Sequence, residues 1–375
     1  MTESHDLTVR LRAWSYRRQG LGRAAAEPEE ALRDVVAVYS SHPTAPLALL
    51  CRCQALDANG FADLERRRAV VRLPAMRQSV FLLPTVTAPR IVAATRQPME
   101  RRAGALRYAG LDWDAYTRLK PRVLEIAREP VTAADLRAAL ERGDPALGEA
   151  RLMTAVRTMT FEGLVLRLGT SLRADSPRYV AADAWLGQPL VEADPEESLR
   201  WLAEAYLRAY GPARVEDFAW WSGVSRGRAR AAFAGSGLVD VGGGLMLPAD
   251  QEAAFSRVEP LDAEAIDLLP KWDAYTMGYA PDGRQRLVDD AHFGRAYSTA
   301  KTGGAGGTSG DGLPLVLRGG RAVASWSHRF QGDQMLVTVA PFPAETLASA
   351  ACEGACAEVG RLLGASAVAV TMAVG

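Results

Sequence analysis

The hydrophobic pattern over residues 201–248 restarts twice at helical spacing and then changes to short apolar runs. Apolar residues recur every three or four positions up to Tyr210, which predicts a helix with one buried face. Gly211 and Pro212 end that helix. A second run of the same spacing ends at Gly223. The stretch therefore predicts two consecutive helices with a sharp break between them.

A third helix and a hairpin are expected to follow. Ser225 is a good N-cap, and Arg226 and Arg230 lie one turn apart on the helix behind it. Two short apolar runs then flank the triple glycine 242–244, which predicts strand, tight turn and strand. Three helices followed by a hairpin is the order of a winged helix, and its arginines would contact DNA phosphates. A packing module with solvated arginines is the alternative.

The start of the chain shows a related pattern. A basic helix is expected within residues 1–23, with Trp14 facing inward and Arg17 and Arg18 facing outward. A second helix is expected over residues 29–38. The polar stretch 39–46, with two prolines, then separates it from another apolar helix. A polar loop between two buried helices is a natural place for a functional site.

Residues 69–84 alternate in polarity and are rich in β-branched and bulky apolar side chains. This composition predicts a hairpin, and it carries Arg72, Arg77 and Ser79. A basic hairpin after helices repeats the wing pattern.

The same plan recurs in residues 131–186, where two helices precede two strands and Thr132 is placed to cap the first helix. The module thus occurs about three times without a strict sequence repeat. From residue 268 the pattern changes to short strands separated by turns. A helix over residues 343–363 and a final strand close this part.

The expected fold class is α+β, with tandem winged-helix (helix-turn-helix) modules followed by a small C-terminal β-rich domain. The expected segments are a first winged helix with the basic hairpin at 1–110, a second at 111–192, a third at 193–260 and the β-rich domain at 261–375.

Charge limits the kinds of partner. The chain of 375 residues has a formal net charge of zero, so it has no overall field of the sort that marks generic nucleic-acid binders. Any DNA contact must use a local patch, and arginines are concentrated in the first third. A scaffold that never touches nucleic acid is the hypothesis that the zero net charge favours.

Cysteine placement argues against a metal site. Cys51 and Cys53 lie some three hundred positions from Cys352 and Cys356, and neither spacing matches a zinc knuckle. No secretory signal follows Met1, which points to a reducing cytoplasm. We also expect no membrane span, because no run of eighteen apolar residues occurs. The glycine-rich stretch 301–312 lacks the lysine-serine ending of a phosphate loop and is interpreted as a surface loop.

The succession of modules resembles the AlkZ and YcaQ group of winged-helix proteins, which comprises bacterial DNA glycosylases and their relatives. The matching stretches are R-R-Q-G-L at 17–21, the hairpin at 76–82, the module at 205–223 and L-P-x-x-D-x-Y at 269–275. The resemblance covers nearly the whole chain.

In that family, a Gln-x-Gln or Gln-x-Asp pair positions or activates water against the sugar of a damaged nucleotide. Anchored on the proline that often follows the motif, the pair falls here on Tyr39 and Ser41, before His42. Another register places it on Arg52 and Gln54. In both registers this sequence departs from the signature.

This departure matters because losing one member of a positioned acid-base pair forfeits roughly 10² to 10⁴ in rate. The resemblance therefore supports DNA binding by this protein more strongly than catalysis. Tyr39, Ser41 and His42 could form a different site, since a neutral imidazole beside a hydroxyl takes up a proton near neutral pH. The alternative is a polar turn that caps a helix.

Further binding residues are expected from the basic patches and helix spacing, and phosphate contact by Arg77 is implied by the resemblance. The candidate DNA contacts are Arg17, Arg18, Arg72, Arg77, Ser79, Arg226 and Arg230. Asp273 and Tyr275 would line the cleft beside the β-rich domain, or Asp273 would simply hold a backbone turn. A cap over a helix end is the competing role for Arg77.

The implied function is that of a winged-helix DNA-binding protein with double-stranded, damaged DNA as its partner. If it is an enzyme, the resemblance implies a DNA glycosylase that removes bulky alkylated purines by hydrolysing the N-glycosidic bond. The alternative is a non-catalytic protein that binds DNA or sequesters a lesion or genotoxin on the same scaffold. No metal or nucleotide cofactor is implied, and we expect a cytoplasmic monomer.

Overall fold

The computed structural model describes residues 2–40, 44–142, 147–169, 171–174, 176–190, 192–234, 237–298 and 310–373. The chain forms two compact units. The first contains Met1–Tyr39, Thr44–Ala62 and Ala203–Gly375, and the second contains Ser40–Pro43 and Asp63–Leu202. The four segments expected from the sequence stay a proposal.

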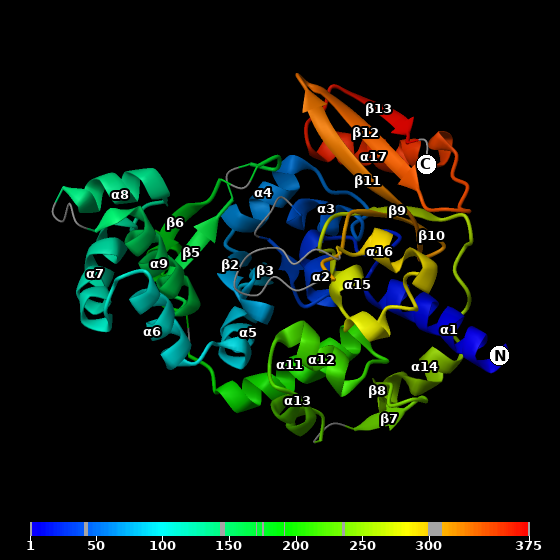
Figure 1. Cartoon of the computed structure of the whole chain (residues 1–375), viewed down its shortest axis with the longest axis horizontal. Coiled ribbons are helices and arrows are strands. Elements are labelled where there is room, and N and C mark those ends of the chain that lie inside the picture. The colour runs from blue at the N-terminus through cyan, green and yellow to red at the C-terminus, as the bar shows by residue number, and fades with distance from the viewer. Residues whose placement is uncertain are drawn as a thin grey trace. The chain divides into compact units, whose positions relative to one another are not determined.

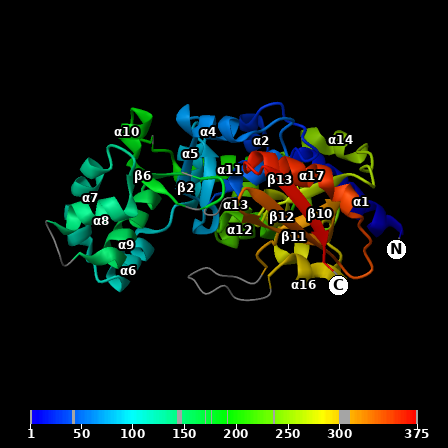
Figure 2. The same ribbon diagram turned by 90° about the horizontal axis from the view of Figure 1, so that it is seen from above.

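The second unit contains the helices α5 (Ala88–Thr95), α6 (Met99–Tyr108), α7 (Trp113–Ile126), α8 (Ala133–Glu141), α9 (Gly148–Phe161) and α10 (Ala182–Leu186) (Figures 1 and 2). Of these, α6, α7, α8 and α9 pack around one apolar core. Leu106, Tyr116, Leu136 and Val156 are fully buried in this core. The expected cap is confirmed, because the Thr132 hydroxyl accepts a hydrogen bond from the Asp135 backbone N–H at 3.1 Å.

The two hairpins of this unit form a single sheet. The strands that this unit contributes to the sheet are β2 (Val70–Pro74), β3 (Val80–Pro84), β4 (Val131–Thr132), β5 (Val165–Leu168) and β6 (Arg178–Ala181), in the order β3-β2-β5-β6-β4. The expected first hairpin is confirmed, and Arg72 of β2 pairs with Arg167 of β5 to join it to the second. All five residues of β2 are buried, including the polar Arg72.

The first unit begins with α1 (Thr2–Arg18), α2 (Pro28–Asp34), β1 (Val38–Tyr39) and α3 (Ala45–Leu50). Trp14 is buried and Arg17 and Arg18 are exposed, as expected. The second helix ends earlier than expected, because Val36 takes a φ of 67°, which a helix does not allow. The helix α4 (Ala58–Arg66) follows.

The expected helices and hairpin of residues 201–248 are confirmed as α11 (Pro195–Tyr210), α12 (Val215–Ser222), α13 (Arg226–Phe233), β7 (Leu238–Asp240) and β8 (Met246–Pro248). Ser225 caps α13 by accepting from the Arg228 backbone N–H at 3.3 Å. Gly223 ends α12 in the left-handed conformation, with a φ of 79°. The short helix α14 (Glu252–Ser256) follows, and its Phe255 packs edge-on against Trp14 of α1.

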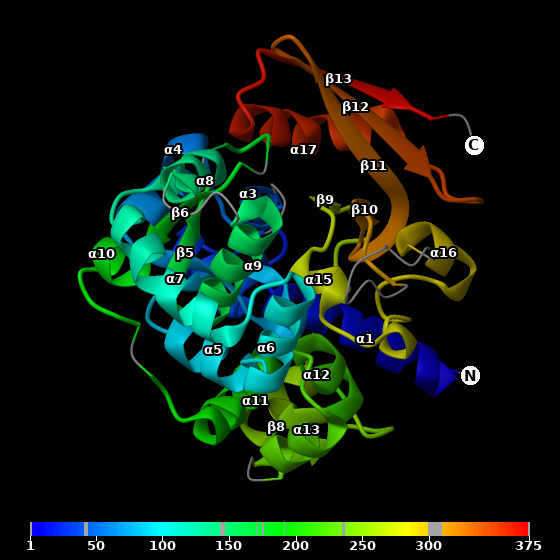
Figure 3. The same ribbon diagram turned by 60° about the vertical axis from the view of Figure 1, so that its left-hand side comes forward.

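A five-stranded sheet closes the first unit. It contains β9 (Ile266–Leu269), β10 (Leu315–Arg318), β11 (Arg321–Gln331), β12 (Gln334–Pro341) and β13 (Ala367–Met372), in the order β13-β12-β11-β10-β9. The helix α17 (Ser349–Leu362) packs against this sheet (Figure 3). The sequence placed its start at residue 343, six residues too early. Short helices α15 (Ala274–Met277) and α16 (Phe293–Ala296) lie in the connection between β9 and β10.

The mixed α+β class and the C-terminal sheet are thus confirmed. Across the described ranges, every helix is too short or too polar to cross a membrane.

Candidate functional site

Tyr39, the first residue of the expected site, ends β1 and lies against Trp272. The two ring centroids are 4.5 Å apart and the rings are inclined by 52°. Both side chains are half-buried, so part of each ring remains accessible. Ser41 and His42, the other two expected catalytic residues, lie outside the described residues.

Trp272 has a strained backbone. It sits in the turn between β9 and α15 with a φ of 59°, a region that bulky side chains rarely occupy. Such a conformation costs about 1–3 kcal/mol and persists only where the surroundings enforce it. Its N–H donates to the Gly312 carbonyl at 3.1 Å, and Lys271 Nζ lies 3.9 Å from the centre of its ring. An indole is therefore held at a fixed place, with a cation beside it.

The next residue, Asp273, anchors this turn through the hydrogen bonds of its carboxylate. Its carboxylate is fully buried and accepts parallel hydrogen bonds from Arg52 at 2.9 and 2.8 Å. It also caps α15 by accepting from the Tyr275 backbone N–H at 2.8 Å. Of the two roles considered from the sequence, the structure supports the structural one for Asp273.

Arg52 has no exposed surface and binds only protein groups. It donates to the backbone carbonyls of Gln19 at 2.9 Å and Ala48 at 2.7 Å as well as to Asp273. Burial alone would lower the pKa of Arg52, but the Asp273 carboxylate outweighs burial and raises it. Arg52 is therefore a permanent internal cation, which favours the register that places the family signature on Tyr39.

A second buried carboxylate lies in β9, next to the same turn. Asp267 accepts a hydrogen bond from the Tyr16 hydroxyl at 2.7 Å. Burial raises the pKa of Asp267 above its ordinary value, and the hydrogen bond from Tyr16 and the charge of Arg52 oppose that shift. The Tyr275 hydroxyl donates to the Gly320 carbonyl at 3.0 Å. These contacts join α1, β9 and α15 beneath the site.

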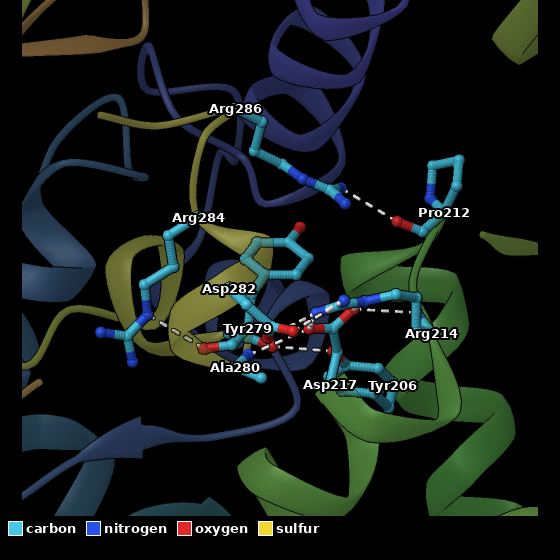
Figure 4. Close-up of polar contacts among 10 residues, drawn as sticks. Tyr206, Pro212, Arg214, Asp217, Tyr279, Ala280, Asp282, Arg284 and Arg286 are labelled. Atoms are coloured by element: carbon cyan, nitrogen blue, oxygen red, sulfur yellow. Dashed lines mark hydrogen bonds and ion pairs between the residues drawn. The ribbon is translucent and has the colours of Figure 1, made fainter. Parts of the chain in front are cut away.

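The loop after α15 is fixed to α12 through Asp217 (Figure 4). This fully buried carboxylate accepts from Arg214 Nη2 and from the Ala280 backbone N–H, both at 3.0 Å. Arg214 also bonds Asp282 at 2.8 Å. A side chain at position 283 would place its Cβ 2.6 Å from Asp217 Oδ1, so only glycine fits there. The helix and hairpin module of residues 201–248 is thus joined to the loop that follows α15.

The structure binds the two candidate cations of α1 to backbone groups. Arg17 donates to the carbonyls of Glu259 and Pro260, and Arg18 donates to the carbonyl of Arg208 at 3.0 Å. Arg226 and Arg230 are exposed on α13. A phosphate contact by these four residues stays a prediction.

In the second unit, the candidate contacts lie on the first hairpin. Arg72 is buried and donates to the Ser40 hydroxyl at 2.8 Å and to Glu65. This burial counts against a direct phosphate contact by Arg72. Arg77 and Ser79 are half-exposed in the turn, and Arg77 has a φ of 50°. Their assignment also stays a prediction.

Two residues of the site were missed from the sequence, namely Lys271 and Trp272. The L-P-x-x-D-x-Y stretch marked their position, but its variable places were not considered. Trp272 is hydrogen-bonded to Gly312, about forty residues away, and this contact leaves no local signal in the sequence.

A metal site has little support among the described residues. Asp289, His292 and Glu345 are the one group there whose ligand atoms lie within 4.8 Å of one another. Arg321 already bridges the two carboxylates, at 2.7 and 2.6 Å. A guanidinium ion thus neutralises the charge that a metal would need. The four cysteines are free thiols.

Comparisons with known proteins identify the family. The model of the AlkZ-like DNA glycosylases matches residues 32–365. The chain belongs to the AlkZ-like DNA glycosylase family. This confirms the resemblance seen in the sequence.

Two members show how far the AlkZ-like match extends. The interstrand DNA cross-link repair glycosylase of Streptomyces sahachiroi is 34% identical over 189 residues, which are 47% of this chain and 46% of that relative. The structure of Streptomyces sahachiroi DNA glycosylase AlkZ matches with a TM-score of 0.75 at 22% identity. That match covers 97% of this chain and 99% of the other. It establishes an AlkZ-like fold over nearly the full length.

Proposed function

We propose that this protein binds double-stranded DNA carrying bulky alkylated purines and hydrolyses the N-glycosidic bond of the damaged nucleotide. The family match over residues 32–365 is the observation that carries this proposal. The three helix-and-hairpin modules act as winged helices. Their exposed arginines, among them Arg226 and Arg230, contact phosphates and supply affinity without base readout.

In this proposal, Tyr39 and Trp272 recognise the lesion. Two half-buried aromatic rings in contact offer a surface on which a displaced or enlarged base stacks, and the fixed turn keeps that surface ready. Lys271 beside the indole contacts a flanking phosphate. The strain at Trp272 supports this role, since strained conformations cluster at functional sites.

Hydrolysis adds a water oxygen to C1′ of the deoxyribose as the bond to the base nitrogen breaks and its electron pair leaves with the base. A purine alkylated on a ring nitrogen is cationic and departs as a neutral molecule, so the enzyme needs no strong acid. Its task is to place the water and accept a proton. Tyr39, Ser41 and His42 are the residues proposed for that task, with the His42 imidazole as the proton acceptor.

A non-catalytic lesion-binding protein is the second candidate. The observation that favours it is the chemistry of the signature positions, where Tyr39 and Ser41 stand in place of an amide or a carboxylate. Asp273 cannot replace the missing acid, because both of its oxygens are bound to Arg52. Such a protein would protect or sequester the lesion without releasing the base.

One experiment separates the two candidates. The protein is incubated with duplexes carrying N7- and N3-alkylpurines, and abasic sites are measured by alkaline strand cleavage. Fluorescence anisotropy measures binding to the same duplexes. Release that is lost in Tyr39→Ala and in Ser41→Ala supports the glycosylase. Tight binding without release supports the sequestering protein, and neither activity would overturn both.

A further inference from the structure

The first unit contains a cavity of about 420 Å³ beside the N-terminal helix. Its walls come from α1, from the connector before β9 and from the turn between β10 and β11. The apolar part is formed by Val9, Ala13, Pro260, Leu261 and Ala263, and the polar part by three arginines and one glutamate. None of these residues belongs to the Tyr39 site or to the candidate DNA contacts.

Three arginines from separate places in the sequence line this cavity, namely Arg12, Arg318 and Arg321. Arg318 and Arg321 flank the Gly319-Gly320 turn, whose φ angles of 54° and 74° allow the tight reversal between β10 and β11. A Cβ on Gly320 would lie 3.3 Å from Arg12 Cγ. The glycine thus lets the arginine of α1 approach the turn closely.

Two of the three arginines have carboxylate partners. Arg318 uses both terminal nitrogens, donating to Glu345 at 3.1 Å and to the Thr346 carbonyl at 2.9 Å. Arg321 bonds both Glu345 at 2.6 Å and Asp289 at 2.7 Å. The charges of Arg318 and Arg321 are therefore balanced by those of Glu345 and Asp289. Arg321 still has a second terminal nitrogen with no hydrogen bond among those that the structure shows in the described residues.

Arg12 is different, because it has no carboxylate partner among the described residues. Its Nε donates to the Arg286 backbone carbonyl at 2.8 Å, its terminal nitrogens have no hydrogen bond among those shown for the described residues, and the residue lines the cavity. Burial lowers the pKa of Arg12, and the nearby charge of Arg321 lowers it further, while Tyr275 and Asp289 raise it. A bound anion would stabilise the half-buried Arg12 cation, because it would offset the repulsion from Arg321.

We propose that the Arg12, Arg318 and Arg321 cavity is a binding site for a phosphate group. Planar guanidinium groups form paired, charge-assisted hydrogen bonds with phosphate oxygens, and Arg12 supplies the free donors. The apolar wall suits the organic part of a phosphate ester. Glu264 is the opposing feature, since its exposed carboxylate also lines the cavity and repels an anion.

The site is tested with sodium phosphate and a nucleoside 5′-monophosphate, against sodium chloride at matched ionic strength. We expect each phosphate compound to raise the unfolding temperature in a saturable way and to release heat in titration calorimetry. Arg12→Gln weakens binding roughly 10-fold or more, because it removes the unpartnered charge. Glu264→Gln strengthens binding, because it removes the opposing charge.

Arg295→Gln is the matched control. Arg295 is exposed on α16 and lies outside the cavity, so the same loss of charge should leave phosphate binding unchanged. Arg12→Lys keeps a charge and tests the requirement for a planar fork if Arg12→Gln does not fold. Absence of saturable binding at millimolar phosphate overturns the proposal. Equal weakening by Arg12→Gln and Arg295→Gln overturns it too.

A third arm identifies the source of the phosphate. Undamaged duplex DNA that displaces the nucleotide assigns the cavity to a backbone phosphate. A nucleotide that stays bound in the presence of duplex assigns it to a small phosphate ester. Neither result depends on base release, so the site stands or fails separately from the proposed glycosylase.

Discussion

The two terminal nitrogens of Arg52 donate to the two carboxylate oxygens of Asp273 at 2.9 and 2.8 Å, and neither side chain is exposed. The pair lies directly beneath the Trp272 turn. Breaking such a buried pair leaves an unpaired charge in the interior and typically costs about 3–5 kcal/mol. We therefore expect Arg52→Met and Asp273→Asn each to lower the free energy of unfolding by about that amount, measured by urea denaturation.

The double variant Arg52→Met with Asp273→Leu is the control. It removes both charges, so it should recover much of the loss of either single variant. If the single variants unfold at the same urea concentration as the parent protein, the pair has no part in stability.

Trp272 gives a prediction for binding. Stacking of a base on an aromatic side chain contributes about 1–3 kcal/mol. We expect Trp272→Ala to weaken binding to an alkylated duplex by about 5- to 150-fold, whereas Trp272→Phe keeps a ring and most of the affinity. Anisotropy titrations measure the difference. Equal affinity of the alanine and phenylalanine variants would remove Trp272 from the proposed lesion contact.

Asp267 gives a prediction for pH dependence. Because burial raises its pKa, the folded chain holds this proton more tightly than the unfolded chain does. The associated stability is complete below the unfolded pKa of about 4 and is lost as pH rises through the raised value. Asp267→Asn removes that loss. The free energy of unfolding of the variant should therefore rise relative to that of the parent protein as pH increases from about 4 to 8.

Urea denaturation of both proteins across this pH range measures the gain. Asparagine still accepts the hydrogen bond from the Tyr16 hydroxyl, so packing is little changed. Parallel pH profiles of the two proteins would show that Asp267 does not titrate differently in the folded state.

The cysteines give a prediction for reactivity. Burial raises the pKa of Cys53 to about 11 and that of Cys356 to about 12, and it also raises the pKa values of Cys51 and Cys352. A thiol must lose its proton to react. At about pH 8, iodoacetamide should leave all four cysteines of the folded protein unmodified and alkylate all four after denaturation. Mass spectrometry counts the adducts, and rapid labelling of the folded protein would contradict the burial.

Local signals in the sequence predicted much of the fold. Ser225 and Thr132 cap helices because their hydroxyls reach backbone N–H groups three residues ahead, a relation that the sequence contains in full. Gly223 ends α12 for an equally local reason. Such signals therefore located helices before any tertiary contact was known.

The candidate site depended on contacts that no local pattern contains. Arg72 was predicted to contact DNA, but it is bound to Glu65. The two side chains meet only when the hairpin has folded, so the sequence alone does not show the contact. Trp272 is hydrogen-bonded to Gly312, and Arg52 is neutralised by Asp273 more than two hundred residues later. The sequence could predict where the site lies through Tyr39, but not which neighbours complete it.

The pairing of Arg72 with Arg167 makes two hairpins into one sheet, and it has a consequence for how the chain comes apart. The Glu65 carboxylate accepts from the Gly169 N–H at 3.2 Å across the same seam. A fragment cut near residue 110 would leave β2 as an open apolar edge, which invites aggregation. We therefore expect the boundaries of cooperative unfolding to differ from those of the repeated modules, with the second unit unfolding as one body.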